Sequence, residues 1–185
     1  WQWESADTHL VYADEHGTSL VSSDVVFDRL ETEDPDLWVT RPRTTRIVAT
    51  PIMVDGVLFI STPLYQAAAI DARTGKTLWV HDPRTYTSGT PAPAPWVHRG
   101  VSYWENDGDA RIVWGTGDGY LIAVDAKTGI PAEDFGENGR VDLVYGLPRA
   151  THGQRDNLNL LPLASQSAPL VIGDTIIVGS SINDF

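Results

Sequence analysis

The sequence has no cysteine among its 185 residues and only one methionine. Without thiols the chain can form neither disulfides nor thiolate metal sites. No apolar run approaches the roughly 20 residues that a membrane-spanning helix needs. Basic residues are also scarce, because 13 Lys and Arg stand against 25 Asp and Glu, for a formal net charge of −12. Nucleic acid and anionic membrane surfaces both attract a basic face, so neither is an expected partner.

What is present is typical of a folded domain, with 42% hydrophobic and 21% charged residues. The chain begins with Trp1 and stops soon after an apolar, strand-like run, so we expect a piece of a longer protein. Residues 1–45 are acidic and lack clean periodicity. We expect them to be mostly irregular, with one short helix within residues 22–38 that ends at Pro35. Residues 46–185 form the second expected unit.

From Arg46 onward the pattern favours β-strands. "RIVATPIMV" and "VLFIST" are joined by Asp55-Gly56, the strongest short signal for a hairpin. "AAAID" (67–71) and "TLWVH" (77–81) follow, which predicts an antiparallel meander of four strands. Residues 82–100 contain four prolines, and proline is poorly tolerated inside a sheet, so this segment should leave it.

The chain then repeats itself. "AIDARTGK" (69–76) returns as "AVDAKTG" (123–129), and "TPIMVDGVLFISTP" (50–63) returns as "APLVIGDTIIVGSS" (168–181). Repeated four-stranded sheets that stack radially form a β-propeller, usually of four to eight blades. We therefore predict an all-β fold, a partial β-propeller with about two blades and the start of a third. A β-sandwich is the alternative, although a sandwich does not need repeats.

The repeat resembles a known motif. Its pattern "AxDxxTGKxxW" is filled by Ala69, Asp71, Thr74, Gly75, Lys76 and Trp79. It is similar to the tryptophan-docking motif of pyrroloquinoline quinone (PQQ) dehydrogenases, and non-enzymatic propellers such as outer-membrane assembly scaffolds carry it too. Gly75 would take a positive φ in the tight turn, and Trp79 would lie flat over a neighbouring blade. In the second copy Glu133 stands where the tryptophan would be, with Phe135 close by.

Other stretches narrow the resemblance to the PQQ dehydrogenases. They are "TPIMVDGVLFISTPLYQAAAIDARTGKTLWVHDP", "HRGVSYWE", "FGENGRVDL" and "SAPLVIGDTIIVGSSINDF". Together they extend over residues 46–185, and "RGVSYW" with "FGENG" resembles the membrane-type glucose and quinate enzymes most. The resemblance implies an eight-bladed propeller that holds PQQ and a calcium or similar cation near its axis.

Such an enzyme would oxidise an alcohol, sugar or polyol hydroxyl and pass electrons to a quinone or a cytochrome. A periplasmic location is implied, with membrane association of the full-length protein left open. The alternative is a non-catalytic propeller scaffold that binds protein partners. The resemblance also implies that the catalytic base and the remaining blades lie beyond residue 185, so no catalytic residue is identified.

The resemblance implies roles for five residues. Arg99, in "HRG", would face the carboxylates or carbonyl edge of PQQ, which suits the fixed fork of donors of a guanidinium. Gln166 and Ser181 fall where the family has polar contacts to PQQ, although threonine is commoner at the first position. Asp184 would give the metal a carboxylate oxygen, and Asn183 could add an amide oxygen. Surface or turn roles are the alternative for each of them.

The chain also departs from the family pattern. Some members carry a vicinal disulfide over the quinone, whereas Pro93-Ala94 stands at about that place here. Leu64 stands near the position of a histidine of membrane-type members, and Val48 replaces a glutamate of some alcohol enzymes. The substrate class therefore stays open. His81 and His98 lie near these positions, and lone histidines are more often structural.

Overall fold

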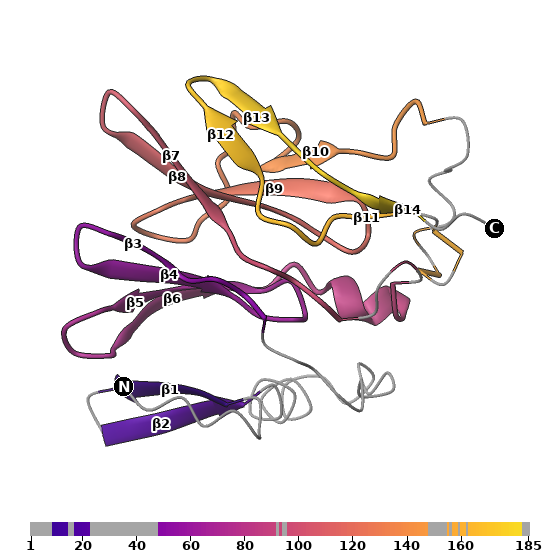
Figure 1. Cartoon of the computed structure of the whole chain (residues 1–185). Coiled ribbons are helices and arrows are strands. Elements are labelled where there is room, and N and C mark those ends of the chain that lie inside the picture. Colours follow the sequence, from indigo (N-terminus) through magenta and orange to yellow (C-terminus); the bar gives the residue numbers. More distant parts are fainter. Residues whose placement is uncertain are drawn as a thin grey trace.

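The computed structural model describes residues 48–91, 93, 96–147, 155, 157–158, 160–161 and 163–182, together with the backbone of 9–14 and 17–22. These residues form β-strands, with one short 3₁₀ helix, η2. The strands lie in antiparallel sheets. Figure 1 shows the sheets stacked as layers in chain order. The predicted all-β class is confirmed, and within the described residues no helix is long and apolar enough to cross a membrane.

The first four-stranded sheet, or first blade, is a meander in the order β3-β4-β5-β6. Asp55 and Gly56 both have positive φ, at 49° and 81°, as a two-residue hairpin turn with right-handed twist requires. The strands β5 and β6 have the predicted bounds. The four strands are β3 (Ile52–Val54), β4 (Val57–Ser61), β5 (Ala67–Asp71) and β6 (Thr77–His81).

The second blade repeats this meander with its own four strands, in the order β7-β8-β9-β10. Between the blades, the described residues of 82–100 lie outside the strands, as predicted, and contain η2 (Thr85–Ser88). The second blade differs at its outer edge, because β10 lies 11 residues beyond the repeated turn, after a loop that passes through Pro131. Its strands are β7 (Ser102–Asn106), β8 (Asp109–Gly115), β9 (Tyr120–Asp125) and β10 (Arg140–Asp142).

The repeated turn has the same construction in both blades. Asp71 Oδ1 accepts hydrogen bonds from the backbone N–H groups of Arg73 and Thr74, at 2.9 and 2.8 Å. Asp125 Oδ1 does the same for the residues two and three positions further on. In each copy these contacts hold the pKa of the aspartate below its ordinary value, against the opposite effect of desolvation. The aspartate of the motif is therefore the residue that closes the turn.

Trp79 joins the two blades. Its side chain is 8% exposed, and its indole Nε1 donates to the Ala126 carbonyl at 3.0 Å. The ring lies directly over Gly129, where a Cβ would come within 2.6 Å of Trp79 Cδ2. Gly129 also has a positive φ of 71°. The tryptophan of the first copy of the motif therefore docks on the turn of the second copy, as the sequence predicts.

The main core lies between the facing sheets of the two blades. From the first blade come Phe59, Ala67, Ala69 and Trp79, and from the second come residues of β8 and β9. The fully buried members of this core on the second blade are Ile112, Trp114, Ile122 and Val124. Burial of large apolar side chains contributes about 1.5–3 kcal/mol each, so this interface is the main source of stability.

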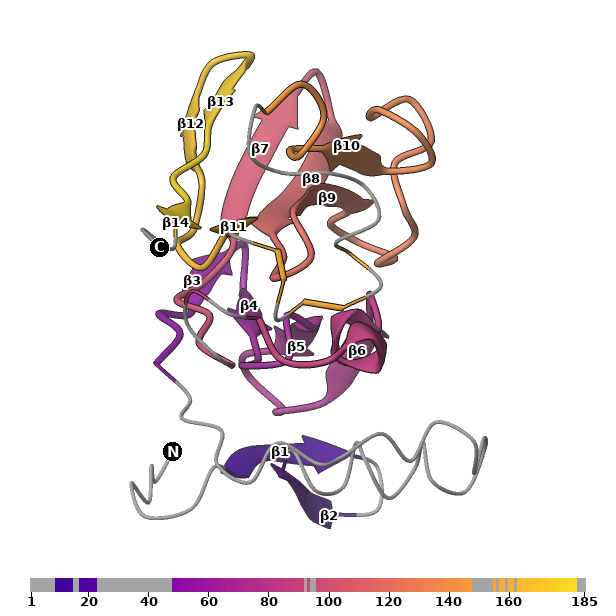
Figure 2. The same cartoon turned by 90° about the vertical axis from the view of Figure 1, so that its right-hand side faces the viewer.

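A third unit begins against the second blade. β12 (Leu170–Ile172) and β13 (Thr175–Ile177) form a hairpin that lies beside β7 in two views of the fold (Figures 1 and 2). Trp104 Nε1 donates to the Gly173 carbonyl at 3.0 Å. A short pair, β11 (Leu163–Ala164) with β14 (Ser181–Ile182), completes this part. Two blades and the start of a third make a partial β-propeller, as predicted.

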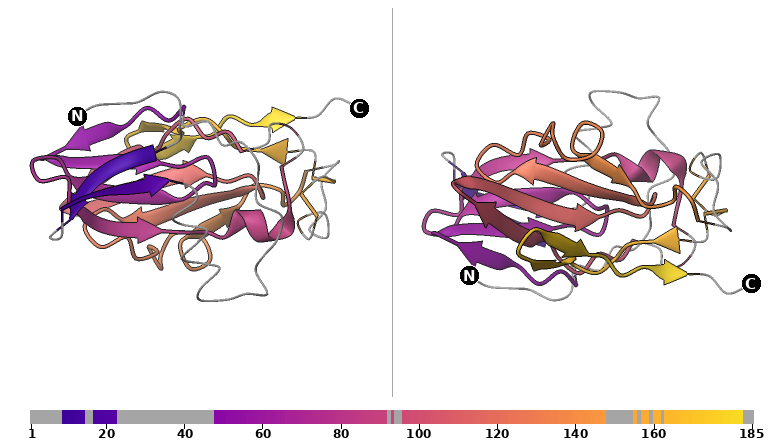
Figure 3. Two further views of the ribbon diagram at one scale, coloured as in Figure 1. Left: turned by 90° about the horizontal axis from the view of Figure 1, so that it is seen from below. Right: turned by 90° about the horizontal axis from the view of Figure 1, so that it is seen from above.

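The first 45 residues contain a feature that the sequence analysis missed. β1 (His9–Asp14) and β2 (Gly17–Ser22) form an antiparallel hairpin, where an irregular segment was expected. Figure 3 shows it crossing the face of the first blade that points away from the second. The β-favouring residues "LVY" and "SLV" are interrupted by acidic and small residues, which weakens the alternating pattern. The short helix expected within residues 22–38 lies outside the described residues and stays a prediction.

Candidate functional site

The site is built on the segment that enters β7. The Thr50 N–H donates to the Arg99 carbonyl at 2.8 Å, and the Arg99 N–H donates to the Gln166 carbonyl at 2.7 Å. These two bonds tie the beginnings of all three units together. Gly100 follows with a φ of 144°, and a Cβ there would lie 3.0 Å from the Thr50 carbonyl oxygen. A side chain at residue 100 would therefore push the units apart.

Three side chains predicted to contact the cofactor meet at this place. Gln166 is buried, and its Oε1 accepts from Ser181 Oγ at 3.1 Å and from Arg99 Nη1 at 3.5 Å. Arg99 itself is exposed. The residues are separated by 67 and 15 positions in the sequence. The fold therefore brings together one guanidinium, one amide and one hydroxyl beside the segment that enters β7. Their role toward a ligand stays a prediction.

The chemistry of this cluster fits PQQ. The cofactor is a planar quinone with several carboxylates, and an exposed guanidinium is the side chain best suited to bind a planar anion in a bidentate manner. Gln166 Oε1 accepts a long hydrogen bond from the guanidinium, and Ser181 adds a further hydrogen-bonding group. The two predicted metal ligands, Asn183 and Asp184, lie outside the described residues. In the described part of the chain no three His, Asp or Glu residues gather as a metal site.

The positions where the sequence departs from the family lie near the same end of the blades. Leu64 is fully buried and packs with Tyr65, Tyr86 and Trp96, so it contributes to a small core and not to a ligand site. Val48 is 40% exposed. Pro93 is half-buried, whereas Ala94 is outside the described residues. An apolar cluster therefore surrounds Leu64, where the resemblance implied a histidine in membrane-type members.

A buried polar layer lies beneath the cluster. His98 is completely buried, its Nδ1 makes a 2.6 Å hydrogen bond with Ser61 Oγ, and its ring meets the Tyr65 ring edge-on at 5.3 Å. Burial lowers the pKa of His98 to about 4 and raises that of Tyr65. Both rings are therefore uncharged at neutral pH. Ser61 and Tyr65 escaped the sequence analysis, because nothing in "STPLY" marks them as partners of a histidine 33 or more residues away.

Asp118 continues this layer. Its carboxylate accepts a short hydrogen bond from Thr116 Oγ1 and a longer one, 3.4 Å, from Thr85 Oγ1. Burial raises the pKa of Asp118, while the hydrogen bond from Thr116 and the nearby Arg140 and Arg155 oppose that rise. Further out, His81 Nδ1–H donates to the Gly129 carbonyl at 3.2 Å, and the His81 ring packs edge-on against Trp114. His81 thus has a structural role beside the docking tryptophan.

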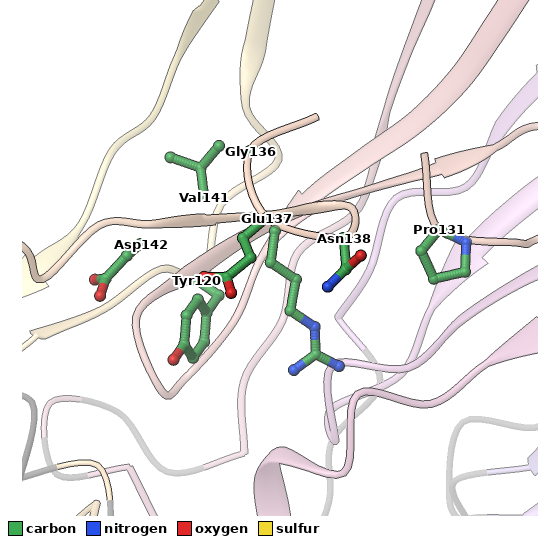
Figure 4. A pocket seen from close by; sticks show the side chains of 8 residues that line it. Tyr120, Pro131, Gly136, Glu137, Asn138, Val141 and Asp142 are labelled. Atoms are coloured by element: carbon green, nitrogen blue, oxygen red, sulfur yellow. The ribbon is translucent and has the colours of Figure 1, made fainter. Parts of the chain in front are cut away.

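A separate cavity of about 590 Å³ lies at the outer edge of the second blade (Figure 4). Its lining residues are Tyr120, Pro131, Gly136, Glu137, Asn138, Arg140, Val141 and Asp142. None of them belongs to the cluster around Gln166. Above the Tyr120 ring lies the guanidinium of Arg155, 4.1 Å from the ring centre, which also donates to Asp142 at 2.9 Å. This edge is an ion-paired clamp that holds residue 155 against the blade.

Comparison with known proteins identifies the family. The model for the PQQ glucose/ethanol/alcohol dehydrogenase β-propeller domain matches residues 29–185. The quinate/shikimate dehydrogenase (quinone) of Acinetobacter baylyi is 33% identical over 158 residues, which cover 73% of this chain and 18% of that protein. The dehydrogenase subunit of the quinone-linked alcohol dehydrogenase of Acetobacter aceti is 42% identical over 82 residues, 44% of this chain and 10% of that protein.

Solved structures agree with this assignment. The quinohemoprotein alcohol dehydrogenase of Comamonas testosteroni superposes with a TM-score of 0.55 at 29% identity, over 75% of this chain and 18% of that one. The chain thus spans less than a fifth of the length of each of these relatives. The match covers both blades, the third unit and the three clustered polar residues. The chain therefore belongs to the family of PQQ-dependent dehydrogenase β-propeller domains.

Proposed function

We propose that this chain supplies part of the PQQ site of a quinoprotein dehydrogenase that oxidises the hydroxyl group of an alcohol, sugar or polyol. The observation that carries the proposal is the meeting of Arg99, Gln166 and Ser181 at one amide oxygen. A scaffold propeller needs no exposed guanidinium held in this way. The similarity to quinone-linked alcohol and quinate dehydrogenases supports the same reaction class.

Each residue has a defined task in this proposal. Arg99 neutralises the carboxylates of the cofactor and fixes its in-plane orientation through the fork of its donors. The buried Gln166 amide holds the guanidinium in place, and the Ser181 hydroxyl would turn from Gln166 Oε1 to donate its one proton to a carboxylate. Bound PQQ would supply the two-electron acceptor for the substrate alcohol. The substrate base and the groups that close the other side of the site are assigned to the rest of the full-length protein.

The proposal extends to the metal, the electron acceptor and the location. Asp184, with Asn183, would ligate a calcium or similar cation, because such ions prefer hard oxygen ligands. Electrons would pass onward to a quinone or a cytochrome, the acceptors named for related dehydrogenases. We propose a periplasmic location, because the resemblance to this family implies it. The related enzymes act on different substrates, so the proposal covers the hydroxyl class and names no single alcohol.

The test is PQQ binding by the full-length protein and two arginine variants. Wild-type apoprotein titrated with PQQ in the presence of Ca²⁺ should bind the cofactor and reduce a dye with a member of an alcohol, glucose and quinate panel. Arg99→Gln should weaken PQQ binding by about 10- to 100-fold, the value of a charged hydrogen bond. Arg73→Gln is the control, because Arg73 is exposed in the turn of the first blade.

Two results would overturn the proposal. Absence of PQQ binding by the wild type would favour the scaffold alternative. Equal affinities of the Arg99 and Arg73 variants would remove Arg99 from the site.

A further inference from the structure

His98 directly precedes Arg99 in the sequence, but the two side chains lie on opposite sides of the chain. Its side chain has no exposed surface, whereas that of Arg99 is exposed. Gly100 is buried again. The short segment of residues 98–100 therefore turns one side chain inward between the first two blades and the next one outward to the candidate site.

The contacts of His98 lead to the first blade, to the loop that follows it and, at the Gly115 backbone, to β8 of the second blade. Nδ1 bonds to Ser61 Oγ, at the end of β4, and Ser61 is itself 1% exposed. The ring packs on Tyr65, whose carbonyl accepts from Trp114 Nε1 of the second blade at 2.8 Å. The wall around the imidazole is thus fixed from both blades.

Arg99 is held by two hydrogen bonds of its backbone. Its N–H and C=O groups bond to Gln166 and Thr50, which fix two atoms of the peptide chain and leave rotation of the segment about that line. The buried side chain one residue earlier is the third anchor. With three points fixed, the direction in which the Arg99 side chain leaves the backbone is determined.

We propose that His98 is a positioning residue for Arg99. Its uncharged, hydrogen-bonded imidazole locks the segment so that the guanidinium faces the cofactor and reaches Gln166. This inference rests on the proposed function, since it concerns the same site. The hydrogen bond makes histidine better than an apolar residue of similar size, because Ser61 would otherwise keep a buried hydroxyl without this partner.

The experiment is a double-mutant cycle on PQQ affinity in the full-length protein. His98→Leu keeps much of the volume and removes the bond to Ser61, and should weaken PQQ binding about tenfold. In the Arg99→Gln background the same change should have almost no further effect, because residues that act through one another are non-additive. His98→Asn places an amide near the former Nδ1 and should recover most of the affinity, even if its thermal midpoint is lowered.

Val113→Ala is the stability control, because Val113 is buried in a separate cluster on the face of the second blade that packs against Ile176 and Val178. It should lower the thermal midpoint of the apoprotein without changing PQQ affinity. His98 would be only a general packing residue if His98→Leu weakened PQQ binding equally in the wild-type and Arg99→Gln backgrounds. The same conclusion would follow if Val113→Ala weakened PQQ binding in proportion to its lower thermal midpoint. If wild type binds PQQ and His98→Leu binds equally well, the inference alone fails. If wild type binds none, the proposed function fails and takes the inference with it.

Discussion

Replacing Gly129 with alanine perturbs the contact between the two blades at one defined point. A Cβ there would lie 2.6 Å from Trp79 Cδ2 and 2.7 Å from Cε3, inside normal van der Waals contact. The indole cannot move aside without stretching its 3.0 Å bond to the Ala126 carbonyl. The φ of 71° adds about 1–2 kcal/mol of strain for any L-residue with a Cβ, and overpacking adds about 1–3 kcal/mol. We expect Gly129→Ala to destabilise the fold by about 2–5 kcal/mol.

The matched control is Gly108→Ala. Gly108 has a φ of 84° in the β7–β8 hairpin, but no atom lies within 4 Å of its added Cβ. It should therefore show only the backbone strain. Urea unfolding of the full-length protein, followed by tryptophan fluorescence, should rank wild type above Gly108→Ala and Gly108→Ala above Gly129→Ala. In a Trp79→Ala background, Gly108→Ala and Gly129→Ala should lower the free energy of unfolding by the same amount. Equal costs in the wild-type background would refute docking of Trp79 on Gly129.

Three other predictions concern carboxylates. Arg155 holds the pKa of Asp142 at about 2, so this ion pair stabilises the fold above about pH 4 and is lost as pH falls toward about 2. Asp142→Asn should be less stable than wild type by about 1 kcal/mol at neutral pH, a difference that urea unfolding should show to vanish near pH 2. Asp125→Ala should lower the thermal midpoint more than Asp71→Ala, because the docking tryptophan rests on the turn that Asp125 closes; the reverse order would contradict this. Asp184→Ala should lose Ca²⁺-dependent retention of PQQ in equilibrium dialysis, whereas retention equal to wild type, with and without a chelator, would exclude Asp184 as a ligand.

The local part of the fold could be predicted from the sequence. The Asp55-Gly56 turn and the strands on either side of the repeated motif follow from turn chemistry and β-propensity, which act over a few residues. Docking of Trp79 was also predictable in kind, because a large aromatic residue at a fixed place in a repeat must be buried on a neighbouring copy. The residue that receives it, Gly129, could be identified only from the fold.

The remaining features depend on contacts between distant segments. The hydrogen bond of His98 with Ser61 spans 37 positions, and the hydrogen bond that Arg155 Nε donates to the Asp118 carbonyl also spans 37. No local pattern distinguishes a buried histidine from an exposed one. The hairpin of β1 and β2 was missed for a different reason, because its polar and acidic residues weaken the alternation that marks a strand. The family resemblance implied that Arg99, Gln166 and Ser181 contact one cofactor. Their hydrogen bonds at Gln166 Oε1 could be identified only from the fold.

Trp79 belongs to the first blade by sequence and to the second by packing. A blade can be defined by its hydrogen-bonded strands or by the segment that buries its own apolar side chains. The two definitions give different segments, displaced along the chain by about one strand and one turn. Exchange of blades between related enzymes should respect the second definition. A junction placed between residues 79 and 129 separates the Trp79 indole from Gly129, so the indole must then pack on the turn of a foreign blade. A junction beyond residue 129 transfers both residues together.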